Sequence, residues 1–197
     1  MKMFIKSICS AMVLCIMFSV IPFSAECSDI STEVFRLHIL ANSDSKSDQA
    51  LKLKVRDKVL ECTESLYKSA DSLVKAETLT NKNLQSIADV AAREIKRCGY
   101  SYPVKAEIKR MYFNTRHYGK ITMPPGMYNA LRITIGSGKG HNWWCVMYPS
   151  MCVGVSTDYD SLKAKATDNQ YSIMTDEGYE LKFKIVEYFV KISSLFS

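Results

Sequence analysis

A cysteine with a histidine as its base is the first combination of residue types in this sequence that could carry out chemistry. Cys145 could act as a thiolate nucleophile if His38, His117 or His141 lay near enough to accept its proton. Cys152 follows shortly after Cys145, and a disulfide between these two cysteines would remove the nucleophile. The residue types leave two alternatives open, a thiol-dependent hydrolase and a short-loop disulfide, and the disulfide is at least as natural.

The glycines of residues 136–140 invite a nucleotide-binding interpretation, which their spacing excludes. The letters GSGKG match neither the phosphate-binding pattern GxxxxGK[ST] nor a GxGxxG that opens a helix. We interpret the segment as a hairpin loop whose glycines allow a partner's backbone to approach closely. The sequence also contains no HExxH or GxSxG motif, and its histidines lack metal-ligand spacing. We therefore expect no catalytic residue, no metal and no cofactor.

Polar side chains at the end of a predicted strand form a first candidate site for binding a partner. In residues 34–40 apolar and polar side chains alternate, so Arg36 and His38 face away from the apolar side. Asn42 and Asp44 follow in a predicted turn. These side chains could bind a partner, or they could form an ordinary polar strand face, and the pattern leaves both alternatives open.

A second candidate site surrounds the chain's two tryptophans, Trp143 and Trp144. Because they are adjacent in a predicted strand, they point to opposite faces, so one belongs to the core. The other is either covered by a helix or exposed, and an exposed tryptophan is a common interface anchor. We include Gly138, Gly140 and Asn142 with both tryptophans in this candidate site.

The periodicity of apolar residues predicts the elements that must position these side chains. Cys62 and Cys98 fall on the apolar faces of two predicted helices, where they could pair or remain buried thiols. Strands are expected at residues 34–40, 104–109, 127–135 and 143–148. Helices are expected from an N-cap at Ser47 to about residue 67, from about 80 to 98, and over 179–196.

These elements predict a single α+β domain. We expect a sheet of about four strands, mostly antiparallel, with helices packed on one face and an amphipathic helix at the C-terminus. The broad apolar face of that last helix would either cover the sheet or dock on a membrane or a partner. The expected organisation is a signal peptide or anchor at 1–27, the α+β domain at 28–156, a polar linker at 157–178 and the C-terminal helix at 179–197.

The N-terminal segment has the layout of a secretory signal peptide. Lys2 and Lys6 precede an uncharged apolar run that is broken by Pro22. Cleavage is expected after Ala25 or after Cys27, and an uncleaved N-terminal anchor is the alternative. In either case we expect most of the chain to lie outside the cytoplasm.

Basic charge is concentrated in the middle of the chain, whose formal net charge is +6. Residues 93–120 contain eight basic side chains and two acidic ones. Such a segment favours an acidic partner or an anionic lipid surface, although a solvated face would look the same. Export disfavours nucleic acid as the partner.

Two segments of the sequence resemble the stage II sporulation protein R family of endospore-forming Firmicutes. The first, residues 35–57, begins with FRLHILANSD, and the second, residues 125–152, contains GKGHNWWCV. Two departures stand out: Pro125 replaces an expected alanine, and Met147-Tyr148 stands where phenylalanine is usual. Neither departure disturbs the pattern.

The resemblance implies a signalling protein and not an enzyme. Members of the family are secreted from the forespore into the septal intermembrane space, where they activate a membrane-embedded aspartic protease that processes pro-sigma-E. The expected partners are that protease and, as an additional contact, a membrane surface, with no nucleic acid and no small-molecule substrate. Two alternatives remain: an exported thiol-dependent hydrolase using Cys145 and a histidine, and a membrane-surface or structural module.

Overall fold

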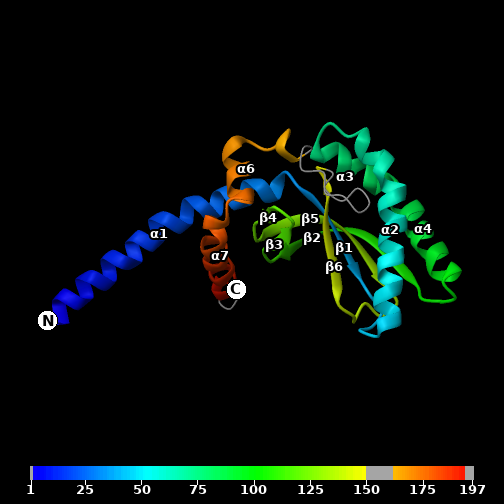
Figure 1. Ribbon diagram of the computed structural model, residues 1–197, viewed down its shortest axis with the longest axis horizontal. Coiled ribbons are helices and arrows are strands. Elements are labelled where there is room, and N and C mark those ends of the chain that lie inside the picture. Colours follow the sequence, from blue (N-terminus) through cyan, green and yellow to red (C-terminus); the bar gives the residue numbers. More distant parts are fainter. Residues whose placement is uncertain (1, 150–161, 194–197) are drawn as a thin grey trace. The chain divides into compact units, whose positions relative to one another are not determined.

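The structure of the protein is a computed structural model that describes residues 2–149 and 162–193. The chain forms two compact units, coloured along the sequence in Figure 1. Unit 1 contains Met1–Thr32, Tyr112–Met127 and Asp168–Ser197, and unit 2 contains Glu33–Met111 and Tyr128–Thr167.

A four-stranded sheet in the order β2-β5-β1-β6 forms the centre of unit 2. Its central strand β1 (Phe35–Leu40) pairs in parallel with β5 (Gly126–Ile135) and antiparallel with β6 (Asn142–Tyr148). The strand β2 (Val104–Phe113) lies at one edge. The predicted α+β class with a four-stranded, mostly antiparallel sheet is confirmed.

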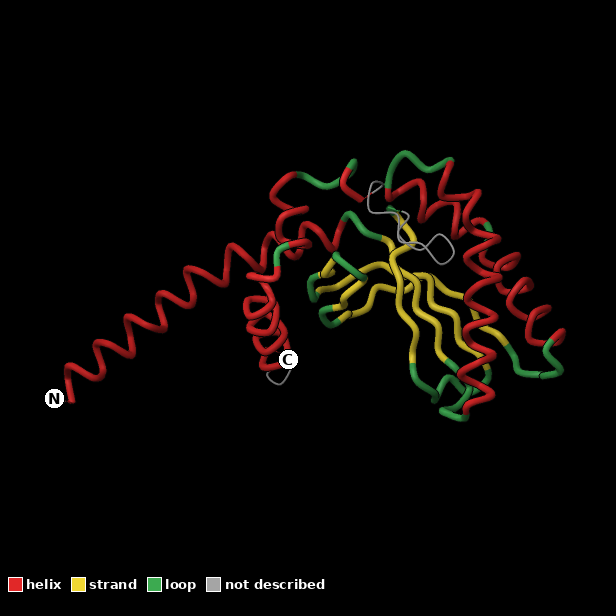
Figure 2. Tube along the Cα trace, viewed as in Figure 1, coloured by secondary structure: helices red, strands yellow, loops and turns green. Residues whose placement is uncertain are grey.

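The helices of unit 2 lie on one face of this sheet, as Figure 2 shows. They are α2 (Lys46–Lys68), α3 (Leu73–Lys82) and α4 (Leu84–Arg97). Their apolar side chains bury the core against β1, β5 and β6, and α2 and α4 each turn an apolar stripe toward the sheet. The largest fully buried members of this core are Phe35, Leu37, Ile39, Ile87, Ile95 and Leu131.

The N-cap of α2 lies two residues earlier than predicted. The N-cap is Ser45 and not Ser47, because the Ser45 hydroxyl accepts a hydrogen bond from the main-chain N–H of Asp48 at 3.1 Å. A capping side chain satisfies the N–H two or three residues further along, and Asp48 lies three residues after Ser45. The Ser47 hydroxyl instead lies 3.0 Å from that of Ser45.

Unit 1 combines segments from the beginning, middle and end of the chain. The long helix α1 (Lys2–Thr32) contacts α7 (Glu180–Ser193). A hairpin of β3 (Arg116–Tyr118) and β4 (Ile121–Met123) contacts α6 (Asp168–Thr175), which is followed by the 3-10 turn η1 (Glu177–Tyr179). Within the described residues, no helix has the length and apolar character that crossing a membrane requires.

The stretch expected to be a polar linker is partly helical. Residues 157–161 lie outside the described residues, but α6 and η1 form within the remainder. The side chains of Ile173 and Met174 are buried, 0% and 1% exposed. These two apolar residues explain why α6 packs on β4, although the neighbouring residues in the sequence are mostly polar.

Candidate functional site

The loops of the two candidate sites meet at the end of the sheet. Antiparallel pairing of β1 with β6 places Leu40 opposite Asn142, so the turn after β1 meets the glycine loop before β6. The Asn42 amide oxygen accepts from the main-chain N–H of Ser137 at 3.0 Å. The Asn42 main-chain oxygen accepts from the Ser137 hydroxyl at 2.6 Å. We call residues 41–45 and 136–141, joined in this way, the loop clasp.

The glycines of the loop clasp are required by contact within the chain. A Cβ at Gly140 would lie 2.2 Å from the main-chain oxygen of Ser43, too close for any side chain. Gly136 and Gly138 have positive φ values of 57° and 62°, a backbone conformation that glycine adopts without steric penalty. The close approach that the glycines allow is therefore that of the chain's own turn, and contact with a partner at Gly138 and Gly140 stays a prediction.

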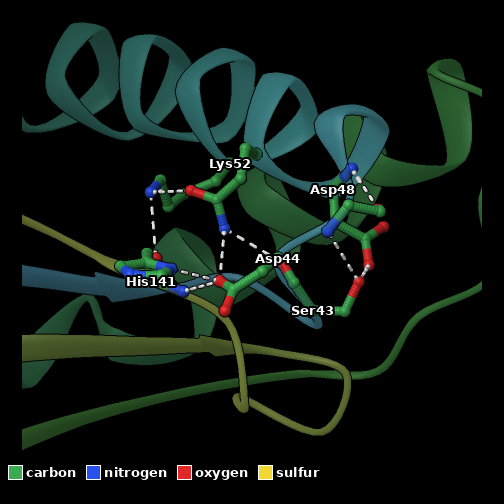
Figure 3. A network of polar contacts seen from close by, with 7 residues as sticks. Ser43, Asp44, Asp48, Lys52 and His141 are labelled. Carbon is green, nitrogen blue, oxygen red and sulfur yellow. Dashed lines mark hydrogen bonds and ion pairs between the residues drawn. The ribbon is translucent and has the colours of Figure 1, made fainter.

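Asp48 is the centre of a hydrogen-bond network that fixes the turn after β1 (Figure 3). Its carboxylate accepts from the Ser43 hydroxyl at 2.6 Å and from the Asn42 amide nitrogen at 2.9 Å. These two hydrogen bonds, that from Ser43 first, hold the pKa of Asp48 below its usual value. Because Asp48 also lies in the first turn of α2, the helix dipole favours its negative charge.

Lys52, which is buried, connects α2 to the start of β6. Its ammonium group donates to the Gln49 side-chain oxygen at 2.6 Å and to the main-chain oxygen of His141 at 2.9 Å. Burial lowers the pKa of Lys52, and the nearby Asp44 carboxylate opposes this effect. The lysine thus holds the glycine loop against the helix from the inside.

Asp44 and His141 form the exposed part of the loop clasp. One oxygen of Asp44 lies 2.5 Å from both the main-chain N and the Nδ1 of His141. The hydrogen bond from the His141 ring is the chief reason that the pKa of Asp44 lies below its usual value. The two side chains remain 54% and 81% exposed, so they are available to a partner. His141 is absent from the predicted binding set, because its contact with Asp44 joins two loops beyond the paired strands.

Arg36 and His38 lie inside the molecule, 0% and 2% exposed. The His38 ring stacks on Trp144 at 3.8 Å between centroids, and the Arg36 guanidinium lies 4.9 Å from the centre of the Tyr128 ring. Burial lowers the pKa of His38 to about 4, and the positive charge of Arg132 adds to this effect. Both residues face away from the helices, as predicted. Their side chains are buried, however, so they do not form an exposed surface for a partner.

The two tryptophans point to opposite faces of β6, as predicted. Trp143 packs against the core, with the Arg56 guanidinium 4.9 Å from its ring centre. Trp144 stacks on His38 on the other face. Each ring is half-buried, whereas Asn142 beside them is exposed. A contact of these residues with a partner stays a prediction.

The cysteines bear directly on the hydrolase alternative. Cys145 is buried and disulfide-bonded, so it has no thiolate to act as a nucleophile. Cys152 lies outside the described residues, and its pairing with Cys145 stays a prediction. Cys62 and Cys98 are free thiols. Among the described side chains, no group of three or more His, Cys, Asp or Glu residues could hold a metal ion.

Comparison with known proteins identifies the family of this chain. The family described as stage II sporulation protein R matches residues 31–158, which include both halves of the loop clasp. Stage II sporulation protein R of Bacillus subtilis (strain 168) is 31% identical over 190 residues, covering 85% of this chain and 84% of that protein. No solved structure shows a significant match. The chain belongs to the stage II sporulation protein R family.

Proposed function

We propose that this protein is a signal of sporulation that activates a membrane-embedded aspartic protease, which then processes pro-sigma-E. In this proposal it is secreted from the forespore into the septal intermembrane space and acts without catalytic residues of its own. Family membership supports the sporulation role. The observation that carries a binding role is the loop clasp, in which two segments far apart in sequence form one ordered and partly exposed surface.

The loop clasp is suited to binding because it is already held in shape. Three anchors fix it: the Asp48 network, the Lys52 bridge and the close contact at Gly140. A surface that is ordered before binding loses little conformational entropy when a partner docks. The exposed Asp44 and His141 would supply the polar contacts.

Activation would follow from preferential binding. A ligand shifts a conformational equilibrium only if it binds one state more tightly than the other. Shifting a protease from about 1% to 99% active would need roughly a 10⁴-fold preference for the active form. The signal would therefore contact a surface of the protease that exists only in that form.

Reconstitution in non-sporulating cells tests the proposal. The full chain is co-expressed, through its own export segment, with the protease and pro-sigma-E, and processing is followed by immunoblot. We expect the processed sigma factor only when all three proteins are present. Absence of processing by exported, folded protein, in cells where a positive-control activator does yield processing, would contradict the proposal.

A further inference from the structure

The second half of helix α1 is part of the core of unit 1. Val20, Phe23, Cys27 and Ile30 are 7%, 3%, 1% and 2% exposed. Their spacing of three, four and three residues places them on one face of a helix. Among the described side chains earlier in the same helix, the large apolar ones are exposed, with Phe18 at 78%. Among the side chains of α1 that the structure describes, the buried face therefore begins at Val20.

Aromatic side chains of α7 and η1 receive this face. The Phe23 ring lies parallel to that of Tyr179, with 5.5 Å between centroids, and 5.3 Å from that of Phe183. The Lys182 ammonium lies over both Phe23 and Tyr179, at 5.4 and 5.1 Å from the ring centres. Phe183 and Val186 are 1% and 5% exposed on the side of α7 opposite its exposed Leu181 and Tyr188. Ring stacking and burial together make the contact of Phe23 with Tyr179 and Phe183 a specific one.

A hydrogen bond adds a polar contact between α1 and the rest of unit 1 to the apolar ones. The Glu26 carboxylate accepts a hydrogen bond from the Asn169 amide at 2.8 Å, which ties α1 to the first turn of α6. The neighbouring Cys27 thiol is buried, and burial raises its pKa to about 12. Residues 20–30 thus contact two later helices of unit 1 through both apolar and polar groups.

These contacts conflict with the cleavage that the sequence suggests. A cut after Ala25 would remove Phe23 and Val20, and a cut after Cys27 would also remove Glu26 and the buried thiol. Either cut would uncover Phe183 of α7 and remove a phenylalanine that buries about 150–250 Å². Signal peptides that are removed are not expected to complete a core of the mature protein.

We propose that residues 20–30 stay packed against α6, η1 and α7 in unit 1 permanently, so that the exported protein is not cut after Ala25 or Cys27. Any processing then falls before Val20. The signal that reaches its partner carries the second half of α1 as a structural element. This inference is independent of the identity of the partner.

The N-terminus of the exported protein tests the inference directly. The full chain is expressed with its own export segment, recovered from outside the cytoplasmic membrane or from the membrane fraction, and examined by intact mass and N-terminal sequencing. We expect an N-terminus before Val20, including that of the uncut chain. A mature N-terminus anywhere after Val20, Glu26 and Ser28 included, would overturn it.

A matched pair of substitutions in α1 tests the packing separately. Phe23→Ala removes a ring that is 3% exposed, and Phe18→Ala removes one that is 78% exposed. In Phe23→Ala we expect hydrogen exchange of the α7 amides to accelerate by about a hundredfold or more, the effect of deleting a buried phenylalanine. Phe18→Ala should change the exchange by less than about twofold. Equal exchange in the two variants would overturn the inference, provided that tryptophan fluorescence shows unit 2 folded in both.

Discussion

His38 links the stability of unit 2 to pH. Its pKa is about 4 in the folded protein, because burial and the charge of Arg132 disfavour the protonated ring. In an unfolded chain a histidine has a pKa near ~6.5. As the pH falls from about 6.5 to about 4, the unfolded chain takes up a proton that the folded protein does not. The free energy of unfolding should therefore be highest above about pH 7 and fall across this window by up to about 3 kcal/mol.

Replacing His38 by phenylalanine should remove this component while keeping a ring stacked on Trp144. Urea unfolding followed by tryptophan fluorescence measures the effect, because both tryptophans lie in unit 2. His117→Phe is the control, since His117 is exposed and lies in unit 1. Equal pH dependence in His38→Phe and in the unaltered protein would contradict the assignment of the effect to His38.

Gly140 is the residue whose size decides whether the loop clasp closes. An alanine there would place its Cβ 2.2 Å from the Ser43 main-chain oxygen, so the two loops must separate. We expect Gly140→Ala to lower stability by about 1–3 kcal/mol, the usual effect of overpacking, and to reduce protease activation as well. Gly99→Ala is the control, because its φ of +84° strains the backbone but nothing lies within 4 Å. It should lower stability by about 1 kcal/mol and leave activation intact.

The capping of α2 gives a prediction for a single element. Because the Ser45 hydroxyl accepts from the Asp48 N–H, Ser45→Ala should lower the stability of unit 2 by about 1 kcal/mol. Ser47→Ala is a matched change within the helix and should have a smaller effect. Urea unfolding of the two variants separates the possibilities. A larger effect at Ser47 would support the cap that the sequence pattern suggested.

Elements with a clear period were predictable, and short ones were not. The alternation in residues 34–40 and 127–135 predicts β1 and β5 because each strand turns one apolar face to the helices. Helix α3 was not predicted, because it buries only Ala76 and Thr80 and its sequence therefore shows almost no apolar stripe. The three-residue strands β3 and β4 are too short to show a period at all.

At the scale of the whole molecule, what the sequence could not reveal is which distant segments meet. The polar turn and the glycine loop were predicted as separate sites, because periodicity gives each element but not its neighbours in the sheet. For the same reason residues 1–27 were predicted to be a signal peptide or anchor outside the folded domain. In the structure, Phe23 stacks on Tyr179 near the other end of the chain. Burial of Arg36 and His38 was likewise hidden, because a polar strand face looks the same whether covered or exposed.

Charge reversal on the loop clasp tests the central claim most directly. Asp44→Lys removes the pair with His141 on the exposed surface, and Asp89→Lys makes the same change on the exposed face of α4. Each variant is co-expressed with the protease and pro-sigma-E, with export and unfolding by urea as checks on folding. We predict that Asp44→Lys lowers processing at least about tenfold, the effect of losing roughly 1.4 kcal/mol of binding, while Asp89→Lys processes normally. Normal processing with Asp44→Lys, or an equal loss with Asp89→Lys, would contradict the claim that the loop clasp is the activating surface.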